Sequence, residues 1–587
     1  MVLSPVLVLV VAICVFAIGY RLYGLFIAKK VLSLNTSRQT PASVLADGRD
    51  YHKTNRFILF GQHFAAIAGA GPLMGPVLAA QFGFLPGVIW ILIGAVLAGG
   101  VHDMVVLFAS VRHKGKSIAN IAQEEIGKST GFIASTTFLI ILVLLIATAS
   151  LVMVNAIQNS PWGTIVVVGT IPIAIMMGLV MRGEGNKPIF LATSLGIILL
   201  FLTVYFGDTL SNIPTVSRLL NVDKKTMIIF LACYTCLTSM LPVWFLLTPR
   251  NYLSTFLKIA TVFALAIGIF YMRPTFLMPA FTPFIHGGGP VVPGKVLPFV
   301  MVTIACGAVS GFHSYIAAGT TSKMIGSEGD IPFVGYGAFL VEGAVALMAL
   351  IAACILHPQD YFAINSTVEA YAKTGMIPVD LPNLSVIVKE QLQARPGGAV
   401  SLAVGMATIF SNIPSMQKLM PYWYHFAIMF EAVFILTLID TGTRVGRFIL
   451  QEMIGRHVPK FNDNAWKPGI IICGVLFTLM WASLLYGGSI STLWPIAGTS
   501  NQLLASCSLI IVSAMLMRMG KIKYVWITLM PGAILAGITL WASYINITTS
   551  YLPKGLYALS AISAGIILLA LSIMILGGKK ILSYILN

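Results

Sequence analysis

Long apolar runs, separated by short polar stretches, recur along the whole of this 587-residue chain. Each run is close to the roughly 20 residues that an α-helix needs to cross the hydrocarbon core of a bilayer. The pattern predicts an all-α polytopic membrane protein with about 15–16 transmembrane helices. The expected spans lie near residues 1–27, 57–81, 84–111, 131–156, 163–181, 188–206, 226–247, 255–272, 296–320, 335–356, 419–440, 468–486, 489–517, 521–545 and 556–577.

One further apolar stretch, 399–416, is short and polar-ended, so it could span the membrane or lie as a re-entrant or interfacial segment. If it does not span, the positive-inside rule gives 15 spans, with the N-terminus outside and the C-terminus in the cytoplasm. If it does span, every later loop changes side and the charge bias weakens. We therefore expect residues 357–418 to form an extramembrane or re-entrant segment. The basic loops behind this preference are 28–56, 111–130, 441–467, 518–524 and the C-terminal tail.

Composition agrees with the hydropathy pattern. Hydrophobic residues make up 58% of the chain and charged residues only 9%, whereas soluble domains carry about 25% charged residues. No cleavable signal peptide is evident, so the first run, VLVLVVAICVFAIGY, is expected to be the first span. The net charge of +17 comes from Lys and Arg in short loops at apolar ends, which indicates topology and no nucleic-acid partner.

The seven cysteines all lie in apolar stretches. Cys233 and Cys236 form a Cys-x-x-Cys spacing, which also occurs at redox and metal sites. Free cysteines pack as small apolar residues inside helices, and we favour this interpretation. The sequence therefore predicts no cofactor and no metal site, and it gives the cysteines no function.

Three apolar segments contain glycine, and two of them also contain proline, where a plain membrane helix would not. They are AIAGAGPLMGP (66–76), CGAVSGFHSYIAAGTTSK (306–323) and YGGSISTLWPIAGTSNQ (486–502). Unwound backbone inside a membrane is tolerated only where it is buried in protein or lines a polar cavity, and broken helices are typical of transporter binding sites. Close helix packing through small residues such as Gly71 and Gly75 is the alternative. With three such segments, we favour a binding site.

Two pairs of segments suggest an internal repeat. Residues 61–69 resemble 311–319, and the segment that begins at Ser239 loosely resembles the one that begins at Ser491. We therefore expect a first repeat at 57–272 and a second at 296–545, related by inverted topology. The two arguments conflict over 399–416: the charge bias favours a segment that does not span, and matching the repeats favours one that does.

Ionisable side chains inside the bilayer are expensive and therefore become functional candidates. The acids within the expected spans are Asp103, Glu342, Glu431 and Asp440, and the histidines are His63, His102, His313 and His425. His102-Asp103 lies deep enough in its span to act as a proton acceptor, with Lys323 as a candidate partner. Asp440 and Arg444, four residues apart, are expected to form a structural ion pair.

Several enzyme signatures are only approximated. The stretch from Ser110 to Ser117 nearly spells a P-loop, but Ser110 replaces the first glycine and a membrane helix precedes it. Asp440-Thr441-Gly442 matches the aspartic-protease tripeptide once, where that chemistry needs two carboxylates. HExxH and GxSxG strings do not occur in the sequence. We expect the chain not to be an enzyme.

Six long motifs resemble the carbon starvation protein A family, in family order from about residue 20 to about residue 520. They are FGQHFAAIAGAGPLMGPVLAAQFG, GGVHDMVVLFASVRHKGKSIA, LPVWFLLTPRNYL, SGFHSYIAAGTTSK, FEAVFILTLIDTGTRVGRFILQE and GSISTLWPIAGTSNQLLA. One departure is visible: the family usually has Gly-His-His where this chain has Gly61-Gln62-His63. A role of the first histidine in proton handling is therefore in doubt here.

The resemblance implies a secondary active transporter of the inner membrane, of the amino acid–polyamine–organocation superfamily type. Such a protein would import peptides or pyruvate during carbon starvation by proton symport; sodium coupling would use the same parts. The proton-coupling residues would be His102, Asp103, Glu342 and Glu431. The substrate-binding residues would be His63, Gly69, Gly71, Pro72, Gly75, Ser310, His313, Gly319, Thr320, Thr321, Trp494, Ser500 and Asn501.

A channel or a membrane nutrient sensor is the competing class of function. A channel should show rings of like groups around a symmetric pore, and a sensor usually carries a soluble output domain. The longest soluble stretch, 357–418, is more typical of a lid. The sequence leaves the choice between peptide and pyruvate, and the oligomeric state, open.

Overall fold

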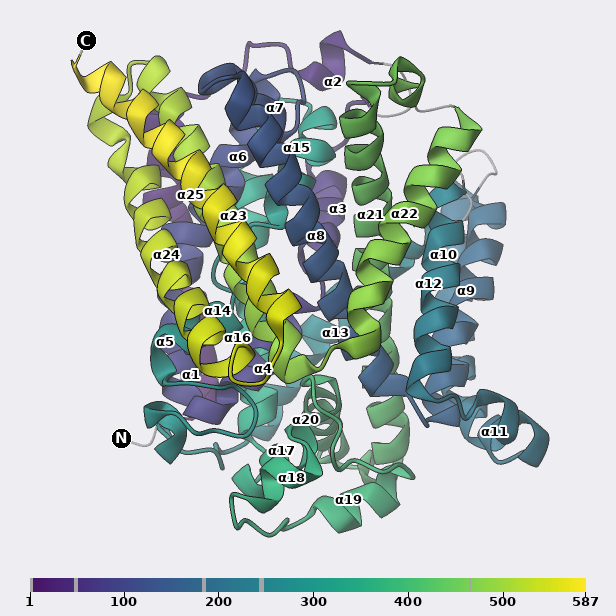
Figure 1. Cartoon of the computed structure of the whole chain (residues 1–587). Helices are drawn as coiled ribbons and strands as arrows, with labels where there is room; N and C mark the ends of the chain where they lie inside the picture. The colour runs from purple at the N-terminus through teal and green to yellow at the C-terminus, as the bar shows by residue number, and fades with distance from the viewer. Residues whose placement is uncertain (1–3, 47–50, 182–185, 242–246, 464–465, 587) are drawn as a thin grey trace.

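The computed structural model describes residues 4–46, 51–181, 186–241, 247–463 and 466–586, and the regular structure in these ranges is helical (Figure 1). Twelve helical stretches are long and apolar enough to cross a membrane. A thirteenth is the pair α3 (Arg56–Ile67) and α4 (Gly71–Ala79), which is bent by 47° at a short break. The predicted fold class, an all-α polytopic membrane protein with discontinuous helices, is confirmed.

The other α-helices fall into two groups. The remaining long or central helices are α1 (Pro5–Ile18), α5 (Phe84–Gly94), α6 (Gly100–Arg112), α8 (Lys128–Ile157), α9 (Pro161–Val180), α10 (Asn186–Ser211), α12 (Lys224–Met240), α13 (Leu247–Met272), α14 (Val296–Thr303), α15 (His313–Gly319), α16 (Ala338–Cys354), α21 (Met420–Gly455), α22 (Lys467–Gly487), α23 (Ile490–Arg518), α24 (Trp526–Ile545) and α25 (Tyr557–Leu586). The short helices of loops and caps are α2 (Pro41–Val44), α7 (Ile118–Glu125), α11 (Pro214–Leu220), α17 (Pro358–Asn365), α18 (Val368–Ala372), α19 (Leu381–Val388) and α20 (Ala399–Ser411).

The number of spans differs from the predicted 15–16 for two identifiable reasons. The expected span 226–247 appears as α12, which has 17 residues, and residues 242–246 lie outside the described part of the chain. The expected span 296–320 is two short helices, α14 and α15, joined by the non-helical residues 304–312. These two segments, added to the thirteen above, account for the fifteen apolar runs.

Residues 357–418 form a cap at the end of the bundle where the N-terminus lies, and the C-terminus lies at the opposite end (Figure 1). Within the cap, α20 has 13 residues, which is too short to be counted among the spans. The cap is fastened to the bundle by hydrogen bonds. The Tyr361 hydroxyl donates to the Val77 carbonyl of α4 at 2.7 Å, and the Asn155 side chain of α8 donates to the Pro396 carbonyl at 3.0 Å.

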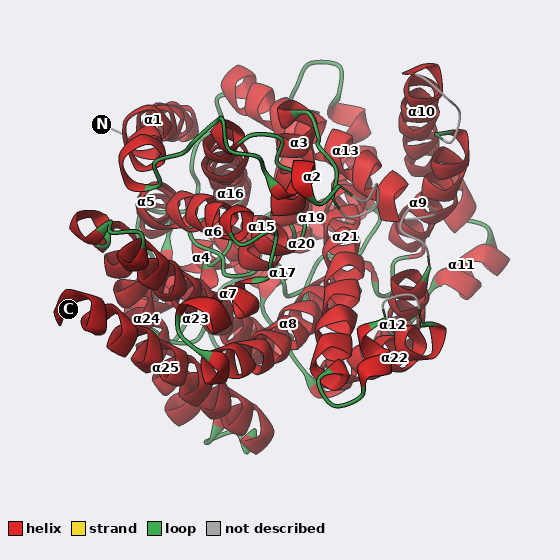
Figure 2. Ribbon diagram, turned by 90° about the horizontal axis from the view of Figure 1, so that it is seen from above, coloured by secondary structure: helices red, strands yellow, loops and turns green. Residues whose placement is uncertain are grey.

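Burial separates an inner set of helices from an outer set. The apolar stretch of α23 is completely buried, whereas only 28% of the corresponding stretch of α10, and of α25, is buried. Seen from above, α6, α15 and α16 lie in the interior, and α10 and α25 lie at the periphery (Figure 2). The outer helices therefore present apolar side chains outward, as a lipid-facing surface requires.

The two segments of the first predicted echo occupy different places relative to their breaks. Residues 61–69 run from α3 into its break, whereas residues 311–319 run from the end of the break after α14 into α15. The second echo falls partly on residues 242–246, outside the described ranges. The inverted repeat stays a prediction.

Gly405 in α20 lies against α16, where an added Cβ would be 2.1 Å from the Ala352 carbonyl oxygen. We expect Gly405→Ala to lower the free energy of unfolding by about 1–3 kcal/mol, because the backbone of α16 must move. Thermal unfolding of the purified protein in detergent measures this effect. Gly537→Ala is the matched control, because nothing lies within 4 Å of a Cβ built there. Equal loss of stability in both variants would contradict the close approach of α20 to α16.

Candidate functional site

The first helix break separates α3 from α4 at residues 68–70. Ala68 leaves the helical conformation at φ −72° and ψ 73°, and Pro72 stands in the first turn of α4, where its missing N–H is tolerated. A Cβ on Gly71 would be 2.2 Å from the Cys306 sulfur, and one on Gly75 would be 2.5 Å from the Thr303 carbonyl oxygen. These glycines therefore allow α4 to approach α14 and the segment that follows it.

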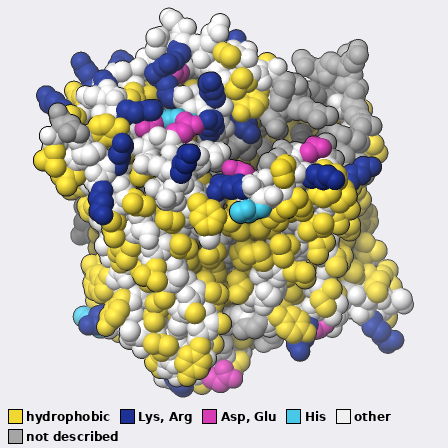
Figure 3. Space-filling model, turned by 45° about the horizontal axis from the view of Figure 1, so that its top comes forward, with side chains coloured by type: hydrophobic (Ala, Val, Ile, Leu, Met, Phe, Trp, Pro, Cys, Tyr) yellow, Lys and Arg dark blue, Asp and Glu magenta, His cyan; other side chains and the backbone are white. Residues whose placement is uncertain are grey.

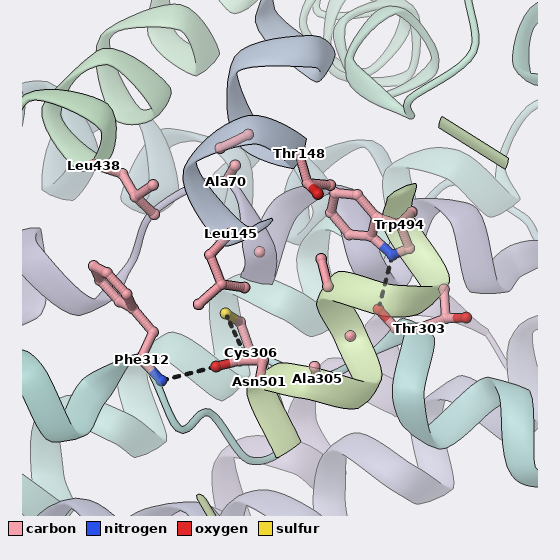
Figure 4. A pocket seen from close by; sticks show the side chains of 14 residues that line it. Ala70, Leu145, Thr148, Thr303, Ala305, Cys306, Phe312, Leu438, Trp494 and Asn501 are labelled. Atoms are coloured by element: carbon pink, nitrogen blue, oxygen red, sulfur yellow. Dashed lines mark hydrogen bonds between the residues drawn. The ribbon is translucent and has the colours of Figure 1, made fainter. Parts of the chain in front are cut away.

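The second break, residues 304–312 between α14 and α15, is held by one side chain of α23. The Asn501 side-chain oxygen accepts a hydrogen bond from the Phe312 N–H at 2.8 Å (Figure 4). Its backbone carbonyl accepts from the Gly311 N–H at 3.1 Å, and its amide nitrogen donates to the Ser310 hydroxyl at 3.2 Å. Asn501 thus satisfies backbone groups that the break has freed, as a membrane interior requires.

The third predicted interruption, 486–502, is not a broken helix, and that expectation is corrected. Gly487 and Gly488 belong to the junction between α22 and α23, and α23 continues through Pro495 without a break. Pro495 lies close to the start of α23, so its missing N–H removes a bond near the helix end and leaves the rest of the helix intact.

A cavity of about 60 Å³ lies between the two breaks (Figure 4). A single water needs roughly 10–15 Å³ by this measure, so there is room for several waters or one small molecule. Three of the predicted substrate residues line it: Gly71, Trp494 and Asn501. Its other lining residues are Ala70, Leu145, Thr148, Ala149, Thr303, Ala305, Cys306, Phe312, Leu438, Ala497 and Gly498.

Other predicted substrate residues lie next to residues that line the cavity. A Cβ on Gly69 would collide with Leu438, which lines the cavity. Ser310 contacts Asn501. Ser500 is buried, and its hydroxyl has no hydrogen-bond partner among the described residues.

The remaining predicted substrate residues do not line the cavity. His63 Nδ1 lies 2.8 Å from the Thr321 hydroxyl, which joins α3 to the turn after α15. Gly319 is half-buried and Thr320 is exposed. His313 belongs instead to a cluster of ionisable groups beside the second break.

Asp103 of α6 is the centre of that cluster. His102 Nδ1 donates to one carboxylate oxygen of Asp103 at 2.9 Å, and His313 Nδ1 of α15 donates to the other at 2.8 Å. The second ring nitrogen of His313 lies 3.4 Å from a carboxylate oxygen of Glu342 in α16. All four side chains are 0% exposed. The cluster therefore joins three elements, and one of them is half of a broken helix.

The cluster can hold a proton between two carboxylates. Asp103 already accepts two N–H bonds, whereas neither oxygen of Glu342 has a hydrogen-bond partner among the described residues. Two buried carboxylates that face one imidazole repel each other unless a proton or a positive charge separates them. Glu342 is thus the group with room for an extra proton.

Cys306, His313 and Glu342 also offer ligand atoms that lie within 4.8 Å of one another. By spacing alone this trio could hold a metal ion, although the sequence predicted no metal site. The charge of Lys258 acts on Glu342, and a like charge beside a cation opposes binding. We therefore interpret the trio as part of the proton cluster.

The predicted ion pair of Asp440 with Arg444 is corrected. Among the described residues, Asp440 pairs with Arg250 of α13 at 2.6 Å and accepts from the Thr238 hydroxyl at 2.8 Å. Arg444 instead donates to the carbonyls of Thr238 at 2.9 Å and Leu241 at 2.7 Å. The C-terminal end of α12 attracts this guanidinium, because its last carbonyls lack helical partners.

Among the described residues, Glu431 and His425 of α21 form no hydrogen bond or ion pair with the Asp103 cluster. Both oxygens of the buried Glu431 lack hydrogen-bond partners among the described residues. His425 stacks on Trp162 with ring centroids 3.7 Å apart. Lys323, predicted as a partner of Asp103, instead lies over the Tyr51 ring at 5.4 Å.

Two residues of α13 that were not predicted from the sequence, Arg250 and Lys258, are fully buried. Arg250 stood within the quoted motif LPVWFLLTPRNYL, and Lys258 lay inside the expected span 255–272. A lysine within an apolar run was the available signal, since such residues face a partner or a cavity.

The model of the family described as carbon starvation protein CstA matches residues 4–542. The chain belongs to the carbon starvation protein CstA family. It is 45% identical over 577 residues to the peptide transporter CstA of Bacillus subtilis. The alignment covers 98% of this chain and 96% of that protein.

Two Escherichia coli relatives carry different names. The peptide transporter CstA is 42% identical over 562 residues, with 92% of this chain and 80% of that protein covered. The pyruvate/proton symporter BtsT is 41% identical over 586 residues, with 92% and 81% covered. A solved structure of a manganese transporter mutant from Eremococcus coleocola aligns with a TM-score of 0.44 at 13% identity, covering 92% of this chain and 99% of that one.

Removal of the Asn501 side chain tests how the second break is held. We expect Asn501→Ala to reduce the free energy of unfolding by about 1–3 kcal/mol, because it leaves the buried Phe312 N–H unpaired. The neighbouring Ser500→Ala should change it by less than about 0.5 kcal/mol, since that hydroxyl has no partner to lose. Thermal unfolding in detergent compares the two. A larger effect at Ser500 would contradict this description of the break.

His113 gives a pH-dependent contact just beyond the end of α6. Its Nε2 lies 2.6 Å from a Glu125 carboxylate oxygen and its Nδ1 lies 2.7 Å from the Ala109 carbonyl. Burial lowers the pKa of His113, but the hydrogen bonds to Glu125 and Ala109 and the charges of Glu125 and Glu124 outweigh it, so the pKa is raised. Both ring nitrogens face acceptors, which suits the doubly protonated ring.

Because the folded state holds this proton more tightly, His113 stabilises the protein fully below the unfolded pKa of about 6.5 and loses that effect as pH rises through the folded pKa. We expect the difference in unfolding temperature between the wild type and His113→Gln to be largest below about pH 6.5 and to shrink as pH rises further. Unfolding measured from pH 5 to pH 9 tests this. A difference that grows with pH would contradict it.

Proposed function

We propose that this chain is a proton-coupled secondary transporter that imports a small carboxylate-bearing nutrient across the inner membrane when preferred carbon is exhausted. The observation that carries the proposal is the buried Asp103–His313–Glu342 cluster, which adjoins a helix break that also borders the cavity. The relatives named as a peptide transporter and a pyruvate/proton symporter support it. The proposal makes the chain a transporter and not an enzyme, a channel or a sensor.

Substrate carboxylate would bind where the two breaks face each other. The N-terminus of α4, at Gly71, borders the cavity and carries the positive end of that helix dipole. The amide of Asn501 and the indole of Trp494 supply polar edges to the same wall. A cavity of about 60 Å³ favours a molecule of pyruvate size. A peptide C-terminus would bind by the same group but would need a wider cavity.

Glu342 would carry the proton, and Asp103 would hold the two histidines in place. Protonation of Glu342 relieves its repulsion from Asp103 across His313. Since His313 belongs to α15, a change of charge at Glu342 alters the force on half of the broken helix. Such a link between protonation and a movable element is what symport requires.

The basic end of the bundle would face the cytoplasm. Lys and Arg side chains gather over the upper part of the molecule, at the end that holds the C-terminus, above a band of apolar side chains (Figure 3). This charge distribution supports an N-terminus outside and a cytoplasmic C-terminus. The cap of residues 357–418 would then cover the outer end.

Uptake by the purified protein in liposomes tests the proposed proton carrier. We expect Glu342→Gln to abolish accumulation of labelled pyruvate driven by an inward proton gradient, while substrate exchange without a gradient persists. Asp103→Asn should also abolish accumulation and leave some binding. The loss should be about tenfold or more, within the range typical of coupling between sites.

Glu369→Gln is the matched control, because that acid lies exposed in the cap. It should accumulate substrate as the wild type does. Full accumulation by Glu342→Gln would exclude Glu342 as the proton carrier. A labelled dipeptide in parallel assays distinguishes the two substrate classes.

A further inference from the structure

Lys258 of α13 places an ammonium group at the break of α3. The side chain is 0% exposed, and its Nζ donates to the carbonyl of Ala65 at 2.5 Å and to that of Ala68 at 2.8 Å. The same nitrogen lies 4.0 Å from the centroid of the Phe434 ring. The lysine therefore joins α13, the end of α3 and α21 at one point.

The two carbonyls are free because of the local sequence. In a continuous helix Ala68 would accept from residue 72, but Pro72 has no N–H. Ala65 would accept from Gly69, whose N–H instead bonds to Ile67 at 2.7 Å. In a membrane protein such carbonyls need a partner within the protein. Lys258 is the partner that this chain supplies.

The oxygen atoms around this point are of the kind that binds a small monovalent cation. Unwound carbonyls and the C-terminal ends of half-helices coordinate sodium in transporters with broken helices. Ser254 and Thr261 lie one turn before and one turn after Lys258, on the same face of α13. Both hydroxyls are buried and have no hydrogen-bond partner among the described residues.

The positive charge of Lys258 is opposite in sign to the carboxylate of Glu342, which belongs to the cluster that the proposed function uses. Glu342 is the carboxylate whose charge acts on Lys258, although the two groups form no ion pair among the described contacts. A buried ammonium is expensive unless carbonyls, a ring face and a counter-charge compensate it. The two carbonyls and the Phe434 ring contact the Lys258 nitrogen directly, whereas Glu342 is not within ion-pair distance of it among the described contacts.

We propose that the ammonium of Lys258 is a tethered cation that occupies the carbonyl site at the break of α3, in place of a free sodium ion. This inference rests on the proposed transport function and deepens it, because it makes transport by this chain independent of sodium. A sodium ion and an ammonium do not share this site, since like charges about 3 Å apart repel strongly.

Removal of the side chain should convert the tethered site into a vacant one. We expect sodium, and not choline, to raise the unfolding temperature of Lys258→Ala in detergent, in proportion to sodium occupancy. The wild type and Lys258→Met should show no sodium-dependent stabilisation, because the lysine or the methionine chain fills the space. Stabilisation of the wild type by sodium, or none for Lys258→Ala, overturns the proposal.

Transport in liposomes gives the second readout. In choline medium with a proton gradient, Lys258→Gln should accumulate about tenfold less substrate than the wild type while exchange persists. Wild-type accumulation by Lys258→Gln overturns the proposal even if Lys258→Ala does not fold. If the wild type itself fails to accumulate substrate, the proposed function fails, and the sodium-dependent unfolding of Lys258→Ala still decides the role of Lys258.

Discussion

A backbone amide or carbonyl that is freed inside a bilayer must find its partner within the protein, because lipid offers none. This constraint governs the two broken helices. Asn501 of α23 holds the amides at the break between α14 and α15. Lys258 of α13 holds the carbonyls at the break between α3 and α4. These two side chains stabilise the unwound backbone on either side of the cavity by hydrogen-bonding its free polar groups.

The same two breaks connect the cavity to the ionisable cluster. His313 begins α15 directly after the second break and contacts both Asp103 and Glu342. The charge of Lys258 at the first break acts on Glu342. Under the proposed function, a proton gained or lost at Glu342 would change the electrostatic force on His313, and so on α15. The chain belongs to the carbon starvation protein CstA family, and one of its relatives is named as a pyruvate/proton symporter.

The features that could be predicted from the sequence are those with a signature in a short stretch of residues. Apolar length marked the spans, and Gly-Ala-Gly-Pro with buried His and Asp marked the first break and the cluster. The breaks within 66–76 and 306–323 were found, whereas 486–502 is continuous because Pro495 lies near a helix start. Contacts between distant residues left no such mark. Arg250, 190 residues from Asp440, displaced the predicted pairing with Arg444, and Lys258 crosses to α3 over a similar separation.

The central claim is that substrate and proton cross the membrane together. The most direct measurement is substrate-triggered proton movement into liposomes that contain the purified wild-type protein, with membrane potential held at zero and sodium absent. Addition of pyruvate to the outside should make the external medium more alkaline as each substrate carries a proton inward. Substrate entry without proton movement, or entry only when sodium is supplied, would contradict the account.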